Sequence, residues 1–226
     1  MIQFYFNPGP NPMKVALLLE EIGLEYKVIP VDGGKGEQFS PAFTAINPNN
    51  KLPAIVDGEA VVFDSNAILL YLAEKTGQFL SDGSLKGRGE LLSWLMFVAT
   101  GVGPYSGQAV HFRHFAPNPK DYAVERYVFE ARRHYGILDA HLANRTWMLG
   151  DTYSIVDMAV WGWARNLPFV LGPEYLDGAL HLKRLMTAID ARPAAVRAAA
   201  LKDGHAFKMD RDDEFRQNMF RHIQTA

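Results

Sequence analysis

Residues 7–14, with the sequence NPGPNPMK, are the first place in the chain where residue types and spacing indicate chemistry. They join an apolar stretch at 2–6 to a run with helical spacing. A helix start presents free backbone N–H groups and a partial positive charge, which stabilise anions and lower the pKa of a thiol. The segment therefore indicates a site for an anion or thiolate, although Asn11 before Pro12 also fits a simple helix N-cap.

Two further segments contain residues that could bind different parts of a small ligand. Residues 47–54 read NPNNKLPA, and a proline just before a short strand can have a cis peptide bond that leaves the preceding backbone to a ligand. Residues 63–68 read FDSNAI, which places an acid and a hydroxyl at the start of an apolar helix, where a carboxylate can bind. Each segment alone also fits a purely structural role.

The elements expected around these segments alternate between strands and helices. Apolar residues in 15–22 recur at the helical spacing, and Gly23 would end that helix. Ser65 would cap a second helix that runs to Gly77. The order βαβ, a loop with one short helix, and then ββα predicts an α/β domain with a mixed sheet. Strands are expected at residues 2–6, 26–31, 54–56 and 61–63.

The rest of the chain is expected to be helical. Ser154 and Asp157 fit a capping box that starts a helix ending near Pro168. Other helical segments are expected at residues 91–98, 122–142, 180–191 and 194–202, followed by a polar tail from Asp203. We therefore predict a domain at residues 1–80, a linker at 81–86, and an all-helical domain with a polar tail at 87–226.

Composition excludes several classes of protein and site. Apolar residues make up 48% of the 226 and charged residues 21%, as in globular proteins, and the net charge of −2 argues against nucleic acid and anionic membranes as partners. No apolar run approaches the ~20 residues of a membrane span, and no signal peptide is visible. The chain has no cysteine, so a cytoplasmic location is expected, and any reacting thiol must arrive with a ligand. His111 and His114 lack a third metal ligand at a supporting spacing, so no metal is expected.

In this order and spacing, the segments resemble the glutathione S-transferase superfamily. The matching pieces are the strand-to-helix turn, the sequence LPAIVD at 52–57, the acid-serine helix start and the Ser-x-x-Asp capping box. The resemblance covers about residues 1–205, and it implies a thioredoxin-like N-terminal domain and an all-α C-terminal domain. The segments that look like the bacterial nu class, or disulfide-bond oxidoreductase group, are residues 31–39, 47–57, 67–77, 103–104, 107–108, 111–112 and 122–127.

The resemblance implies glutathione as the ligand and cosubstrate. Asn11 matches the position whose amide hydrogen-bonds the glutathione sulfur, which would favour the thiolate. Leu52, before Pro53, matches the residue whose backbone pairs with the cysteinyl unit. Asp64 and Ser65 match the pair that binds the ammonium and the carboxylate of the γ-glutamyl end.

The remaining ligand contacts are implied in both predicted domains. Gln38 and Lys51 stand where the glycyl end would lie. Arg133 matches an arginine that reaches the site from the helical domain, although a one-residue shift would bring Arg132 there instead. Tyr5 stands where other classes place a catalytic hydroxyl, but its apolar surroundings favour a core role.

Two positions depart from the group's pattern. Gly9 stands where the group usually has threonine, so a hydroxyl donor to the sulfur is missing. Asp64 stands where the group typically has glutamate, and its shorter side chain is expected to bind more weakly or through a water. The first departure leaves open both the rate and the reaction.

The resemblance implies an enzyme that presents glutathione to a disulfide or a small electrophile. In the nu-class reaction, the thiolate attacks a disulfide through a mixed-disulfide intermediate, with conjugation and peroxide reduction as weaker side activities. Two alternatives stay open: a non-catalytic glutathione-binding module, suggested by Gly9, and a glutathione-dependent lyase or dehalogenase on the same fold. The superfamily usually forms two-fold dimers, so a homodimer is expected, with neither nucleic acid nor membrane as a partner.

Overall fold

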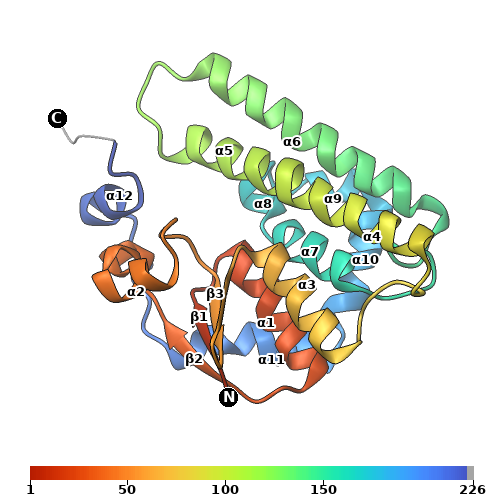
Figure 1. The fold of residues 1–226 in the computed structure, drawn as a ribbon. Coiled ribbons are helices and arrows are strands. Elements are labelled where there is room, and N and C mark those ends of the chain that lie inside the picture. The colour runs from red at the N-terminus through yellow and green to blue at the C-terminus, as the bar shows by residue number, and fades with distance from the viewer. Residues whose placement is uncertain (223–226) are drawn as a thin grey trace.

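The computed structural model describes residues 1–222 and shows a small sheet with helices beside a larger helical part (Figure 1). The sheet has four strands in the order β2-β1-β3-β4. β1 (Ile2–Phe6) runs parallel to β2 (Tyr26–Pro30) and antiparallel to β3 (Ala54–Asp57), which pairs with β4 (Ala60–Phe63). The predicted mixed sheet and the predicted thioredoxin-like and all-helical parts are confirmed.

Helix α1 (Pro10–Ile22) makes the crossover that a parallel strand pair requires. It starts at Pro10 with Gly9 as its N-cap, so the prediction that Asn11 caps it is wrong. Pro10 and Pro12 both fit the first turn because no helical partner exists there for the N–H that proline lacks. Asn11 consequently lies inside the first turn, and its side chain has no capping role.

The core of the molecule lies on both sides of α1. Every residue of α1 from Pro12 to Leu19 is buried. The helix packs against α7 (Ile155–Ala164) and α11 (Pro193–Ala200), and its apolar side chains share one core cluster with residues of β1 and β3. Helix α7 is itself buried along its whole length. The capping box predicted at its start is confirmed, with reciprocal hydrogen bonds between Ser154 and Asp157.

Shorter helices surround this core. In the sheet-containing part, η1 (Gly33–Lys35), η2 (Glu37–Phe39) and α2 (Pro41–Ile46) connect β2 to β3, and α3 (Ser65–Thr76) follows β4. A π-helical turn, η3 (Val98–Val102), joins α4 (Leu85–Phe97) directly to α5 (Gly103–His114), which lies along α6 (Asp121–His141) in Figure 1. The remaining elements are η4 (Leu142–Asn144), α8 (Leu167–Val170), α9 (Tyr175–Gly178), α10 (Leu180–Asp190) and η5 (Leu201–Gly204).

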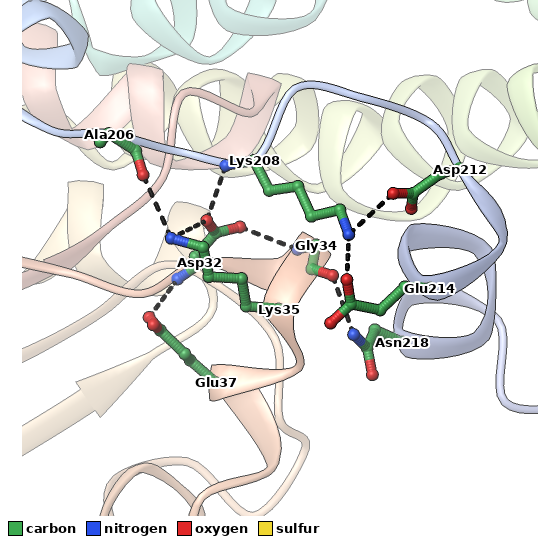
Figure 2. A network of polar contacts seen from close by, with 9 residues as sticks. All are labelled: Asp32, Gly34, Lys35, Glu37, Ala206, Lys208, Asp212, Glu214 and Asn218. Carbon is green, nitrogen blue, oxygen red and sulfur yellow. Dashed lines mark hydrogen bonds and ion pairs between the residues drawn. The ribbon is translucent and has the colours of Figure 1, made fainter.

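The C-terminal segment, residues 205–222, returns to the sheet-containing part and ends in α12 (Asp213–Met219) against η1. Figure 2 shows how it is held: Asp32 accepts a hydrogen bond from the Lys208 backbone at 2.7 Å, and Asn218 donates one to the Gly34 carbonyl at 2.8 Å. The Lys208 ammonium pairs with Asp212 at 3.0 Å and also with Glu214. A Cβ atom at Gly34 would lie 2.8 Å from the Phe215 ring, so this contact requires a glycine.

Candidate active site

A cavity of about 480 Å³ lies where the two parts of the chain meet. The start of α1, the loop before β3 and the start of α3 form one side of it, and η3, α5 and α7 form the other. Six of the eight residues that the sequence assigned to the site line this cavity: Asn11, Lys51, Leu52, Pro53, Asp64 and Ser65.

Asn11 has a fixed orientation at the edge of the cavity. Its Oδ1 accepts a hydrogen bond from Trp163 Nε1 at 2.9 Å and a longer one from Ser65 Oγ at 3.4 Å. An indole nitrogen can only donate, so the contact identifies which amide atom is the oxygen. The amide nitrogen is left to donate to a ligand, at the positive end of the α1 dipole, where a thiolate would be stabilised.

The loop at residues 47–53 provides main-chain groups beside Asn11. The buried Asn47 side chain holds the loop by donating to the Lys51 carbonyl at 2.6 Å and accepting from the Asn49 N–H at 3.0 Å. The Leu52-Pro53 peptide bond is cis. Within residues 1–222, the Leu52 N–H and carbonyl have no hydrogen-bond partner, so both groups remain able to pair with a peptide-like ligand.

The start of α3 combines a carboxylate, a hydroxyl and the backbone N–H of Ser65, which has no hydrogen-bond partner among residues 1–222. Asp64 has φ +71°, which is rare for a residue with a side chain and marks a constrained position. Its Oδ1 caps the helix by accepting from Asn66 N at 2.8 Å and Ala67 N at 3.2 Å, and its other oxygen faces no partner within the described residues. Ser65, which follows, is buried. This helix start suits a carboxylate next to an ammonium group.

Sequence reasoning did not assign a role to Lys14, which also lines the cavity. It is 1% exposed, and its Nζ donates to Ser65 Oγ at 3.2 Å and to Asn66 Oδ1 at 3.5 Å. Burial lowers its pKa to about 7, and the Asp64 charge opposes that shift only partly. Gly162 on α7 makes room for it, since a Cβ there would lie 2.4 Å from Lys14 Cγ. The sequence signal that could have identified Lys14 is a lone lysine in an apolar helix, three residues after Asn11.

Gln38 and Arg133 do not line the cavity. The Gln38 amide nitrogen donates to the carbonyls of Gly33 at 3.4 Å and Asn218 at 3.2 Å, so this side chain faces the C-terminal segment. Arg133 is exposed on α6 and forms a two-pronged ion pair with Glu130, at 3.0 and 2.8 Å. The roles given to Gln38 and Arg133 therefore stay predictions, which the geometry of this cavity does not test.

The helical side of the cavity is built from small and apolar residues. They are Val98, Ala99, Gly103, Pro104, Gly107 and the mostly buried Trp163. Gly103 gives the indole room, because a Cβ there would make a tight contact of 3.0 Å with Trp163 Nε1. Sequence reasoning missed Trp163, since nothing in its local pattern shows that it contacts Asn11.

Three other expectations concern residues away from the cavity. Tyr5 packs against Phe43, with ring centroids 5.5 Å apart, in a small apolar cluster, in agreement with its core interpretation. His111 lies against Phe220, and His114 stacks on Phe169. Residues 1–222 contain no group of three His, Cys, Asp or Glu side chains placed to bind a metal ion. Over the same range, no helix has the length and apolar character needed to cross a membrane.

Comparison with known proteins places these features in a family. The model for "Glutathione S-transferase, N-terminal domain" matches residues 1–74, and that for "Glutathione S-transferase, C-terminal domain" matches residues 99–193. The chain is 51% identical over 207 residues to the disulfide-bond oxidoreductase YfcG of Escherichia coli (strain K12), which covers 88% of this chain and 94% of the relative.

Two solved bacterial structures show the same fold with ligands. A glutathione transferase family member from Pseudomonas fluorescens, with two glutathione bound, has a TM-score of 0.83 and 41% identity, covering 88% of this chain and 92% of that one. A glutathione transferase from Pseudomonas putida, with one glutathione disulfide bound per subunit, has a TM-score of 0.81 and 38% identity, covering 88% and 91%. Both similarities extend across the sheet-containing and helical parts.

Proposed function

Because this chain belongs to the glutathione S-transferase family, we propose that it is an enzyme that reduces disulfide bonds with glutathione. The observation that carries the proposal is the Asn11 amide, which Trp163 orients so that its nitrogen can donate to a sulfur in the cavity. The name of the E. coli relative and the glutathione disulfide bound to the P. putida protein favour a disulfide substrate.

Glutathione would lie along the N-terminal side of the cavity. Its γ-glutamyl carboxylate binds the hydroxyl and the backbone N–H of Ser65, and its ammonium faces the unoccupied oxygen of Asp64. The cysteinyl main chain pairs with Leu52, in the manner of a short added strand. These contacts place the sulfur near Asn11 and direct the glycyl end toward Lys51, and Gln38 would contact that end if the C-terminal segment moves.

The reaction has two exchange steps. The glutathione thiolate, stabilised by the Asn11 amide and the α1 dipole, attacks one sulfur of the substrate disulfide, forms a mixed disulfide and expels the other sulfur as a thiolate. A second glutathione thiolate attacks the mixed disulfide and releases the second substrate thiol together with glutathione disulfide. Two electrons pass from two glutathione molecules to the substrate, so the protein needs no cysteine of its own.

We also propose that the enzyme forms a homodimer and works in the cytoplasm, where glutathione is kept reduced. Apolar side chains are exposed on β4 (Val61 and Phe63), on α4 (Met96) and on α6 (Phe129). Phe63 also lines the cavity, so a subunit packed there would border the site. Light scattering on the wild type and on Phe129→Asp tests this: a homodimer predicts twice the 25.3 kDa chain mass and a loss of mass in the variant.

The function is tested by glutathione-dependent reduction of a small disulfide, coupled to NADPH through glutathione reductase. Asn11→Ala should lower kcat/KM about 10- to 100-fold, as expected when a charge-assisted hydrogen bond is lost. Asn144→Ala, at an exposed asparagine in η4, is the matched control and should have wild-type activity. Wild-type rates in Asn11→Ala would refute the mechanism.

A binding module without catalysis is the second candidate, and Gly9 is the observation that favours it. A wild-type protein that binds glutathione in calorimetry but turns over no disulfide, peroxide or aryl halide would support this candidate. Product identification with halogenated and other electrophiles would reveal a lyase or dehalogenase instead.

A further inference from the structure

Lys14 is a buried cation without a carboxylate partner within hydrogen-bond distance among residues 1–222. It is 1% exposed, and both of its hydrogen bonds go to neutral groups, Ser65 Oγ at 3.2 Å and Asn66 Oδ1 at 3.5 Å. Buried lysines are normally paired, because an ammonium group loses its hydration when it is buried. This unpaired charge lies beneath the helix start where an anion would bind.

The groups that face Lys14 leave its charge largely uncompensated. From α3 it faces Ser65, Asn66 and the charge of Asp64, from α7 it faces Gly162, and on its own helix Asn11 is one turn away. Asp64 is the charged residue that acts on it, but Asp64 is exposed to solvent and caps α3. Burial therefore dominates, and the pKa of Lys14 falls to about 7.

The contact with Lys14 also determines how the Ser65 hydroxyl can be used. A lysine ammonium can only donate, so Ser65 Oγ accepts from it and keeps its own hydrogen for another acceptor. In the structure that acceptor is Asn11 Oδ1, at a long 3.4 Å, and this oxygen already accepts from Trp163 at 2.9 Å. The hydroxyl hydrogen can therefore turn to a ligand carboxylate without leaving Asn11 Oδ1 unpaired.

We propose that Lys14 is a positioning residue for the carboxylate of the ligand: it holds the Ser65 hydroxyl as a donor and supplies the positive charge that the bound carboxylate neutralises. The inference rests on the proposed function, since the carboxylate is that of the γ-glutamyl end of glutathione. A nearby anion favours the charged form of lysine, so binding raises the pKa of Lys14 and takes up a proton. Affinity for glutathione consequently falls as the pH rises above about 7.

The test is calorimetry with S-methylglutathione, whose blocked sulfur removes the thiol proton from the balance. Titrations near pH 7.5, in two buffers of different ionisation enthalpy, give the proton count, and the wild type should take up at most about 0.75 proton per site. Lys14→Met should lose this uptake and bind about 10- to 100-fold more weakly. Lys14→Arg keeps the charge but cannot lose its proton, so it should bind without uptake. Lys27→Met, at an exposed lysine in β2, should match the wild type.

The outcomes distinguish a failure of this inference from a failure of the proposed function. Equal affinity and equal proton uptake in the wild type and Lys14→Met would overturn the role of Lys14 and leave the enzyme proposal intact. Binding by the wild type without proton uptake would overturn it as well, even if neither Lys14 variant folds. Absence of any S-methylglutathione binding by the wild type would overturn both. Loss of disulfide turnover alone, with binding and uptake as expected, would overturn only the enzyme proposal.

Discussion

Trp163→Phe should impair catalysis while the site still binds its ligand. Phenylalanine keeps an aromatic ring beside Gly103 but removes the N–H that donates to Asn11 Oδ1 at 2.9 Å. A single neutral hydrogen bond contributes ~1 kcal/mol, which corresponds to about a fivefold lower kcat/KM for disulfide reduction. The affinity for S-methylglutathione should change less, because the Asp64 and Leu52 contacts do not involve the indole.

A double-mutant cycle isolates this effect from packing. In the Asn11→Ala background the indole N–H has lost its acceptor, so adding Trp163→Phe should cost nothing further in kcat/KM. The coupling between the two sites should therefore be ~1 kcal/mol, in the range seen for residues in contact. The cycle needs four proteins and one assay, the coupled reduction of a small disulfide at saturating glutathione reductase.

A spectroscopic measurement completes the test. The ultraviolet absorbance of the glutathione thiolate gives the pKa of the bound thiol, which Trp163→Phe should raise toward its value in solution, because the amide is free to turn its oxygen to the sulfur. The reasoning is refuted if Trp163→Phe lowers kcat/KM by the same factor in both backgrounds. Additivity of that kind would mean that the indole acts through packing and does not orient Asn11.

Three further predictions concern stability and the C-terminal segment. The pKa of Lys14 is about 7 in the folded chain and near 10.5 when the side chain is exposed, so the unfolded state binds more protons between these two pH values. The free energy of unfolding should therefore rise with pH in this range, by up to ~1.4 kcal/mol per pH unit. Urea unfolding should show this slope in the wild type and not in Lys14→Met. Asp157→Ala leaves the Met148 and Ser154 N–H groups without an acceptor and should lower the free energy of unfolding by about 2–4 kcal/mol, measured by urea denaturation; a smaller loss would mean that water replaces the carboxylate. Asp32→Ala removes the acceptor of the Lys208 N–H, so limited proteolysis should cut residues 205–222 faster than in the wild type. An unchanged rate would show that the remaining contacts, among them the Asn218–Gly34 hydrogen bond, hold the segment without Asp32.

Local patterns predicted most of the fold. The strands, the α7 capping box and the long α6 helix follow from alternation, helical spacing and end signals that are read within a few residues. The start of α1 was missed because two prolines both suit a first helical turn, and only the packed structure shows that the helix begins at Pro10. The end of the chain was left open because its polar residues form α12 through contacts with η1, about 180 residues earlier in the sequence.

The candidate site likewise contains some residues that local sequence patterns identify and others that only the packed structure identifies. The residues that line the cavity from the N-terminal part stand in short segments whose order the sequence displays, and the family resemblance supplied their roles. Trp163 could not be found in this way, because it meets Asn11 across 152 positions of the chain. Lys14 lies in a helix that is buried on both sides, so helical spacing gives no indication of which neighbour its ammonium meets. Tertiary packing alone determines both contacts.

The glycine at position 9 has a different meaning in the structure than in the sequence. Its backbone, at φ −71° and ψ 164°, is open to any residue, so the fold does not demand glycine there. A Cβ would lie 2.9 Å from Asn7 Oδ1, which accepts a hydrogen bond from the Gly9 N–H, so the Asn7 side chain would have to shift. Gly9 borders the pocket under the C-terminal segment rather than the cavity of Asn11. The missing hydroxyl therefore leaves the Asn11–Trp163 contact intact. Whether the chain is an enzyme or a binding module depends on whether one oriented amide and a helix dipole stabilise the thiolate sufficiently, and the Trp163→Phe cycle measures that amide's contribution.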